Sequence, residues 1–98
     1  MNISINSIHF SADKKLKKLI EEKINKLNQF HDSILGANVF LRLEKNEDSE
    51  NKVTEIKLDI PGTELFARKQ SNTFEKSTDS TIEALRIQLK KHKEKQRQ

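Results

Sequence analysis

The spacing of apolar residues changes once within the first thirty positions. Near the N-terminus, isoleucines at nearly alternate positions predict a short strand: Ile3, Ile5 and Ile8. The next apolar residues are three and four positions apart: Leu16, Leu19, Ile20, Ile24, Leu27 and Phe30. With Ser11 as the N-cap and Asp13 in the first turn, this spacing predicts an amphipathic helix over residues 12–30.

The middle of the chain alternates apolar and polar residues, as half-buried strands do. The alternation predicts strands over residues 37–43, 53–60 and 63–71. Residues 46–51 have the length and chemistry of a hairpin loop, and Pro61-Gly62 fits a type II turn. We therefore expect antiparallel pairing among these strands.

A second helical pattern follows the last strand. Asn72 and Glu75 have the spacing of a capping box before a helix of about residues 73–94. One face of this helix carries Phe74, Thr78, Thr81, Ile82, Leu85 and Leu89.

The order of predicted elements is β-α-β-β-β-α, which favours an α+β two-layer sandwich with a four-stranded sheet and two helices packed on one face. The 98 residues suit a single domain, residues 1–98, and we expect the basic tail at about 94–98 to fray. The other sheet face is expected to be open to solvent and to carry Phe40 and Phe66.

Charge is distributed unevenly along the chain. Residues 84–98 hold six basic side chains against one acidic, a net charge of +5, whereas the whole chain carries +4. Residues 11–30 hold six lysines against three acids, and residues 31–83 hold seven basic against eleven acidic residues. Because phosphate affinity follows local charge density, nucleic acid is the first partner to test.

Several kinds of chemistry lack the residues they need. Without cysteine, the chain has no disulfide, thiolate metal site or thiol nucleophile. The three histidines are widely spaced, Gly36 and Gly62 cannot form a phosphate loop, and no serine has a G-x-S-x-G context. We expect neither an enzyme nor a cofactor or metal. The N-terminus lacks a signal-peptide pattern and no apolar run approaches ~18 residues, so we expect a cytoplasmic protein without a membrane span.

The basic residues lie on the two predicted helices, which we expect to form one patch. The alternative for the second helix is a solvated end whose cations oppose the helix dipole. Lys23 falls within the apolar arc of the first helix, either with its stem buried at the core edge or aimed at a ligand. With no Trp or Tyr, phosphate and shape contacts with structured RNA are favoured over base stacking.

Two stretches, LKKLIEEKINKL at residues 16–27 and TIEALRIQLKKHKEK at residues 81–95, resemble the ribosome hibernation-promoting factor family. The resemblance covers nearly the whole chain, includes residues 41–45 and Asp79, and is most specific at QLKKHKEK. It implies the β-α-β-β-β-α fold, no enzymatic activity, and binding to the small ribosomal subunit in the channel for messenger RNA and transfer RNA anticodon stems. An idle ribosome would thereby be kept out of translation in stationary phase or stress.

The same resemblance implies a set of contacts to ribosomal RNA: Lys23, Lys26, Arg86, Lys90, Lys91, Lys93 and Lys95. Relatives often carry Arg where this chain has Ile87, so Arg86 is a weaker candidate. Ile87 is expected to be an exposed apolar residue or to make a local contact. Because the chain stops after the basic helix, it resembles short members of the family. Ribosome dimers would then need a separate dimerising factor, and the chain is expected to be a monomer off the ribosome.

Two other functions stay open. Basic helix ends on an α+β sandwich also suit a general double-stranded RNA-binding module. The acidic middle of the chain suits a protein-interaction domain that uses the sheet face.

Overall fold

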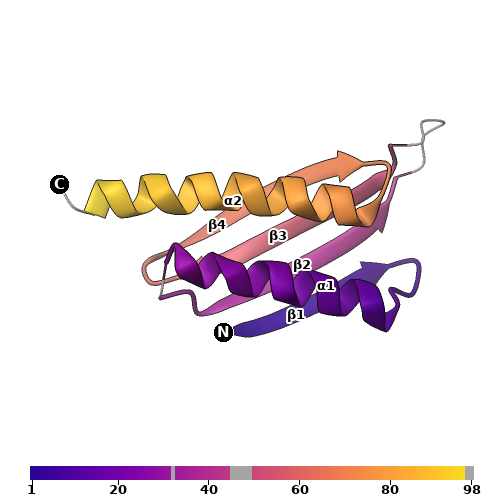
Figure 1. The fold of residues 1–98 in the computed structure, drawn as a ribbon, viewed down its shortest axis with the longest axis horizontal. Helices are drawn as coiled ribbons and strands as arrows, with labels where there is room; N and C mark the ends of the chain where they lie inside the picture. The colour runs from indigo at the N-terminus through magenta and orange to yellow at the C-terminus, as the bar shows by residue number, and fades with distance from the viewer. Residues whose placement is uncertain (32, 45–49, 97–98) are drawn as a thin grey trace.

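The computed structural model describes residues 1–31, 33–44 and 50–96. Its elements are β1 (Asn2–Ile8), α1 (Lys14–Asn25), the 3₁₀ helix η1 (Lys26–Gln29), β2 (Gly36–Leu43), β3 (Lys52–Ile60), β4 (Thr63–Ser71) and α2 (Phe74–Gln96) (Figure 1). This order confirms the predicted α+β fold. Positions 46–49 of the predicted hairpin loop lie outside the described residues, as do residues 32, 45, 97 and 98.

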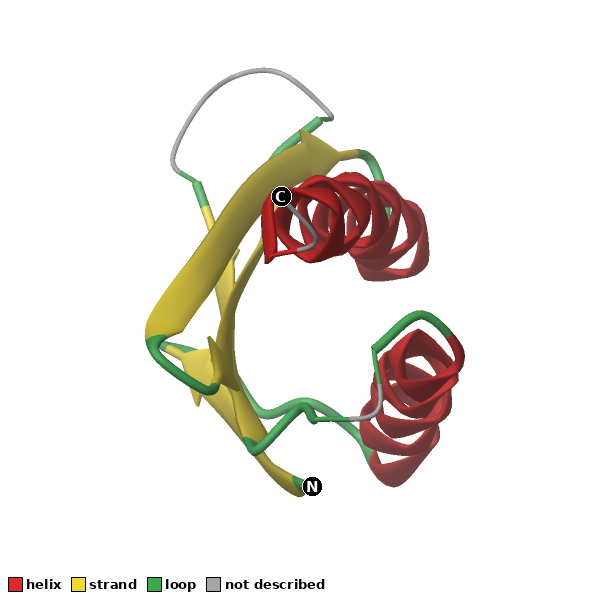
Figure 2. Ribbon diagram, turned by 90° about the vertical axis from the view of Figure 1, so that its left-hand side faces the viewer, coloured by secondary structure: helices red, strands yellow, loops and turns green. Residues whose placement is uncertain are grey.

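The four strands form one sheet in the order β1-β2-β3-β4. β2, β3 and β4 pair antiparallel as predicted, whereas β1 pairs parallel with β2 because α1 returns the chain between them. Both helices cover the same face of the sheet (Figure 2). They also run in the same direction, so their C-terminal ends lie toward the same end of the molecule (Figure 1).

The core lies between the sheet and the helices, where alternate strand residues meet the apolar helix faces. Each of these side chains is at most 6% exposed, and burial of one such aliphatic side chain contributes roughly 1.5–3 kcal/mol. The main members are Ala37, Val39, Leu41, Ile56, Leu58, Ile60, Ile20, Ile24, Leu27, Leu85 and Leu89.

A buried cluster of hydroxyl groups joins the N-terminal half of α2 to β3. Thr54 Oγ1 lies 2.7 Å from Ser77 Oγ and 3.3 Å from Thr78 Oγ1. Thr81 Oγ1 donates toward the carbonyl oxygens of Ser77, at 2.7 Å, and Thr54, at 3.2 Å. All four side chains are buried, so their hydroxyls need partners within the protein. These bonds fix the position of α2 along β3.

Both α-helices begin at a cap other than the predicted one. Asp13, not Ser11, caps α1, since its Oδ1 accepts a 2.8 Å hydrogen bond from the amide three residues later. At α2, Thr73 Oγ1 accepts a 3.1 Å hydrogen bond from the amide three residues later, so the predicted capping box of Asn72 and Glu75 is wrong. Each helix therefore uses the acceptor that lies in register with its third amide.

The first helix is shorter than predicted and tightens at its end. α1 ends at Asn25, and residues 26–29 continue as the 3₁₀ helix η1. Leu27 remains in the core, but Phe30 is 41% exposed. The prediction that Phe30 completes the apolar helix face was wrong, because three residues per turn replace 3.6 before the chain leaves the helix.

The β3–β4 turn and the open sheet face agree with the predictions. Gly62 has φ +85°, the positive value that a type II turn requires of its third residue. On the open face Phe66 is 46% exposed, and Phe40 is half-buried with the Lys57 ammonium 6.0 Å from its ring centroid.

Candidate nucleic-acid interface

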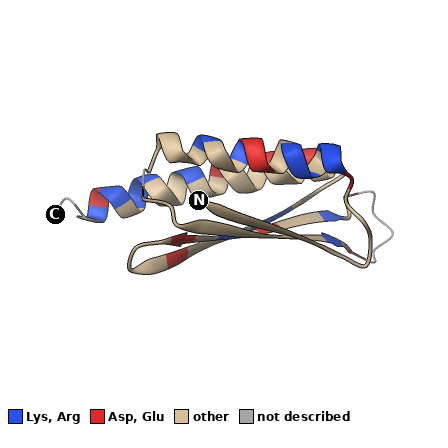
Figure 3. Ribbon diagram, turned by 90° about the horizontal axis from the view of Figure 1, so that it is seen from below, with Lys and Arg blue, Asp and Glu red and all other residues tan. Residues whose placement is uncertain are grey.

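Lysine and arginine gather on the helical layer, and α2 carries the last of them past the end of the sheet (Figure 3). Leu89 is the last buried residue of α2 in the described part of the chain. Beyond it lie four exposed lysines, called here the basic end: Lys90, Lys91, Lys93 and Lys95. The apolar pattern that holds α2 on the sheet therefore stops where the basic end begins.

His92 lies at the boundary between core and solvent. It is half-buried, and its ring centroid is 6.2 Å from that of His31, which follows η1. This contact joins the end of the first helix to the basic end. Among the described residues, no three His, Cys, Asp or Glu side chains are placed to hold a metal ion together.

Lys23 is positioned by a carboxylate on the other helix. Its side chain is 21% exposed, and its ammonium forms an ion pair with Asp79 of α2. The stem thus lies at the core edge while the charge is held by Asp79, and a phosphate would have to compete with that carboxylate. Lys26, by contrast, is exposed at the start of η1.

Arg86 is held by a carboxylate on the preceding turn of α2. Its Nε donates a 3.0 Å hydrogen bond to Glu83 Oε2, and its Nη2 also binds Glu83. These hydrogen bonds hold the pKa of the Glu83 carboxyl below its usual value of 4.5 and raise the pKa of the Arg86 guanidinium. Glu83 thus offsets much of the arginine's charge, and Ile87 is 44% exposed, as predicted.

The structure brings only part of the predicted set together. Arg86, Lys90 and Lys93 surround one hollow, and Arg86, Lys90 and Lys91 line a second on the adjoining side of α2. Lys23 lies instead against Asp79, nearer the N-terminal end of α2.

Two residues of the first hollow were missed by the sequence analysis, Gln29 and Phe30. Helical periodicity assigned Phe30 to the core. Asn25 and Asn28 are weak helix formers near the point where the helix tightens, and this is the signal that favours an early end to α1.

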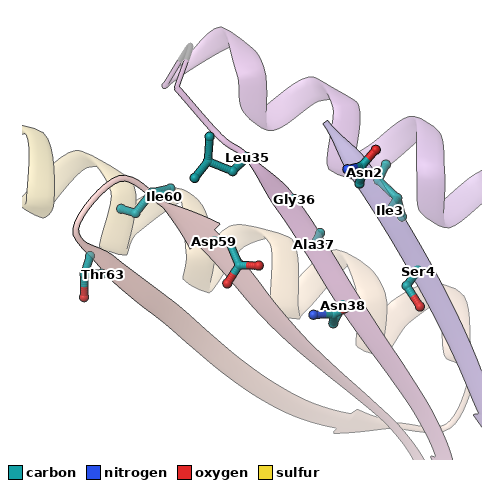
Figure 4. A pocket seen from close by; sticks show the side chains of 10 residues that line it. All are labelled: Asn2, Ile3, Ser4, Leu35, Gly36, Ala37, Asn38, Asp59, Ile60 and Thr63. Carbon is teal, nitrogen blue, oxygen red and sulfur yellow. The ribbon is translucent and has the colours of Figure 1, made fainter.

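A larger hollow lies at the end of the sheet where β1, β2 and β4 begin and β3 ends (Figure 4). Its lining is Asn2, Ile3, Ser4, Leu35, Gly36, Ala37, Asn38, Asp59, Ile60 and Thr63. These residues include one carboxylate and neither lysine nor arginine, so the hollow does not suit a phosphate.

The open sheet face is not uniformly acidic. Glu55 accepts a 3.1 Å hydrogen bond from Arg42 and lies 3.6 Å from Arg68, which also binds Glu44 at 2.6 Å. Two carboxylates of this face, those of Glu44 and Glu55, are therefore paired with arginines, which weakens the case for an acidic docking surface. In the part of the chain that the structure describes, no helix is long and apolar enough to cross a membrane.

Comparison with known proteins identifies the family of this chain. The model of the family described as "Sigma 54 modulation protein / S30EA ribosomal protein" matches residues 3–97. The chain belongs to this family. Membership in the S30EA family agrees with the resemblance at residues 16–27 and 81–95.

Curated members of the S30EA family match over most of the chain. The Ribosome hibernation promoting factor of Pseudomonas putida is 30% identical over 96 residues, which cover 98% of this chain and 90% of that protein. The protein of the same name from Escherichia coli K12 is 29% identical over 98 residues, covering 100% of this chain and 99% of that protein. The Ribosome hibernation promotion factor of Bacillus subtilis is 31% identical over 97 residues, but the match covers only 50% of it.

Two solved structures share the S30EA fold seen here. A ribosomal subunit interface protein from Coxiella burnetii superposes with a TM-score of 0.86, at 22% identity, over 95% of this chain and 98% of that one. The N-terminal domain of Thermus thermophilus Protein Y gives a TM-score of 0.82, also at 22% identity, over 94% of this chain and 99% of that one.

Proposed function

We propose that this chain binds the small ribosomal subunit through its ribosomal RNA and keeps an idle ribosome out of translation in stationary phase or stress. The observation that carries the proposal is the basic end, four exposed lysines in the last turns of α2, the helix whose end projects beyond the sheet. Relatives named ribosome hibernation promoting factor, which align with nearly the whole chain, support it.

The proposed mechanism is steric. The domain occupies the channel that messenger RNA and transfer RNA anticodon stems use, held there by contacts between lysines and phosphates. The basic end and Lys26 make the main contacts, because their ammonium groups are exposed. Arg86 and Lys23 contribute less, since Glu83 and Asp79 already bind their charges. The chain acts as a monomer, and pairing of ribosomes would require a separate factor.

Sedimentation of a lysate from growth-arrested cells tests this function. At low salt the protein should move into the gradient with small subunits and with ribosomes that contain them. Chemical probing of the bound subunit should show protection of nucleotides in the decoding channel. If the protein stays at the top of the gradient at low salt, the proposed function is wrong.

A charge-reversal pair tests the surface. Lys91→Glu with Lys93→Glu should abolish co-sedimentation and lower the slope of log affinity against log salt by roughly one unit per lost phosphate contact. Lys14→Glu with Lys15→Glu is the matched control, because it changes net charge equally in the first turn of α1, at the other end of the molecule. Equal loss in both pairs would contradict a role specific to the basic end.

Competition separates ribosome binding from general duplex binding. A tenfold excess of an arbitrary RNA duplex should leave the bound fraction nearly unchanged. Equal affinity for the duplex and the subunit would favour a double-stranded RNA-binding module. Binding that survives nuclease digestion of the RNA would favour a protein-interaction domain.

A further inference from the structure

An exposed aromatic ring lies among cations where the end of the first helix meets α2. The hollow there has a volume of about 350 Å³, and its lining is Gln29, Phe30, Arg86, Lys90 and Lys93. Arg86 Cζ is 5.6 Å from the centroid of the Phe30 ring, within the range of a cation–π contact. Phe30 nevertheless remains 41% exposed. Part of the ring is therefore available to a ligand.

The charges around the ring suit a ligand with phosphates. Lys90 and Lys93 are one turn apart on α2, so their ammonium groups can reach phosphates on one side of the helix. Arg86 is oriented by its two hydrogen bonds to Glu83, which keeps its planar group beside the ring. An aromatic face for a base and two lysines for the adjoining phosphates are the parts of a site for one unstacked nucleotide.

The other exposed phenylalanine lies in a different charge environment. Phe66 is 46% exposed on the open sheet face, where arginines are paired with Glu44 and Glu55. Such a face offers a polyanion no net attraction. Phe30 therefore lies among an arginine and two lysines, whereas Phe66 has one lysine, its cross-strand partner Lys57, on a face whose arginines are bound by carboxylates.

We infer that Phe30 stacks against one unpaired nucleobase of the bound RNA, while Lys90 and Lys93 hold the phosphates on either side of that nucleotide. This inference rests on the proposed function in that both need RNA binding at the basic end. It adds that the surface selects RNA in which a base is available outside a helix. The lack of Trp and Tyr does not exclude stacking, because Phe30 supplies the ring.

Two RNA hairpins that differ in one nucleotide test the inference. One carries a single bulged 2-aminopurine, a fluorescent adenine analogue, and the other is fully paired. Wild-type protein should bind the bulged hairpin more tightly and quench its fluorescence. Phe30→Leu should weaken binding to the bulged hairpin by about fivefold or more and leave binding to the paired one unchanged, because stacking on an aromatic ring contributes roughly 1–3 kcal/mol per base.

Two further variants separate stacking from an effect on folding. Phe30→Trp restores an aromatic face and should retain both the preference and the quenching. Phe66→Leu removes a ring of similar exposure on the open sheet face and should change neither. Thermal unfolding of Phe30→Leu should match that of the wild type within a few degrees, since the side chain is largely outside the core.

Two results would overturn the inference: no preference of the wild-type protein for the bulged hairpin, or an unchanged preference in Phe30→Leu. These measurements use no ribosomes, so they are independent of the sedimentation test. A chain that sediments with small subunits but ignores the bulge retains the proposed function and loses only this inference.

Discussion

Arg86 illustrates how one neighbouring carboxylate sets what a basic residue can do. Its guanidinium lies between Glu83 and the Phe30 ring. Since Glu83 has a lowered pKa, its carboxylate is ionised at every pH above its usual value of 4.5, and the pair is lost only as pH falls through the lowered pKa. Around neutral pH, Arg86 therefore acts as an oriented planar group more than as a free charge.

Replacement of Glu83 should release that charge. Glu83→Gln is expected to raise affinity for small subunits and to steepen the salt slope by up to about one unit, because Arg86 becomes free to bind a phosphate. The measurement is binding at several salt concentrations near pH 7. Glu75→Gln, in the first turn of α2, removes the same charge far from Arg86. An equal rise in both variants would show an effect of net charge alone.

The buried hydroxyl cluster between β3 and α2 is a second feature of single residues that apolar periodicity does not reveal. A helix face that carries Ser77, Thr78 and Thr81 in place of larger apolar residues can dock only if its hydroxyls find partners. Thr54 of β3 supplies them.

Loss of the Thr54 hydroxyl should lower stability without change in volume. Thr54→Val is expected to reduce the free energy of unfolding by about 1 kcal/mol, since Ser77 can still donate to the Phe74 carbonyl oxygen at 3.2 Å. Urea denaturation measures the change. Thr63→Val, at an exposed position of β4, is the control and should have almost no effect. A Thr54→Val protein as stable as the wild type would mean that the hydroxyl bonds contribute nothing net.

At the scale of elements, the sequence predicted every strand and both α-helices because their periodicities are long and distinct. Helix ends were less predictable, since Ser11 and Asp13, like Asn72 and Thr73, are all good caps and only three-dimensional register selects between them. The η1 turn depends on packing as well as on propensity. That single change of pitch moved Phe30 from the core to the candidate site.

The sequence predicted where the basic residues of the candidate site lie, but not which of them form ion pairs with carboxylates. The local density of lysine and arginine in the sequence is sufficient to predict the basic end. Asp79 as the partner of Lys23 is 56 residues away in sequence, and no periodicity in either helix relates the two. Only the three-dimensional structure therefore shows which lysines are free to bind a phosphate.

At the scale of the whole molecule, stability and the proposed RNA binding belong to different parts of α2. The part up to Leu89 holds the core, and the end of α2 extends past the sheet in a molecule that measures 47 × 24 × 18 Å. A chain that ends at Lys90 should therefore remain folded, with a loss of no more than about 1 kcal/mol, yet fail to sediment with small subunits. Circular dichroism with thermal unfolding checks the first expectation and gradient sedimentation the second. Retained sedimentation would mean that Lys91, Lys93 and Lys95 are dispensable.

The projection of α2 also concentrates positive charge at one end of the molecule. Residues 91–96 extend about 9 Å along the helix axis at 1.5 Å per residue, and at physiological ionic strength the Debye length is about 8 Å. The lysines of this segment therefore lie within about one Debye length of one another and act together on an approaching charge. The electrostatic attraction between a polyanion and this concentrated positive charge would rotate the elongated molecule until its basic tip points toward the polyanion. Attraction of this kind sets the orientation of the first encounter, and dilution of the buffer should speed association far more than a net charge of +4 alone would suggest.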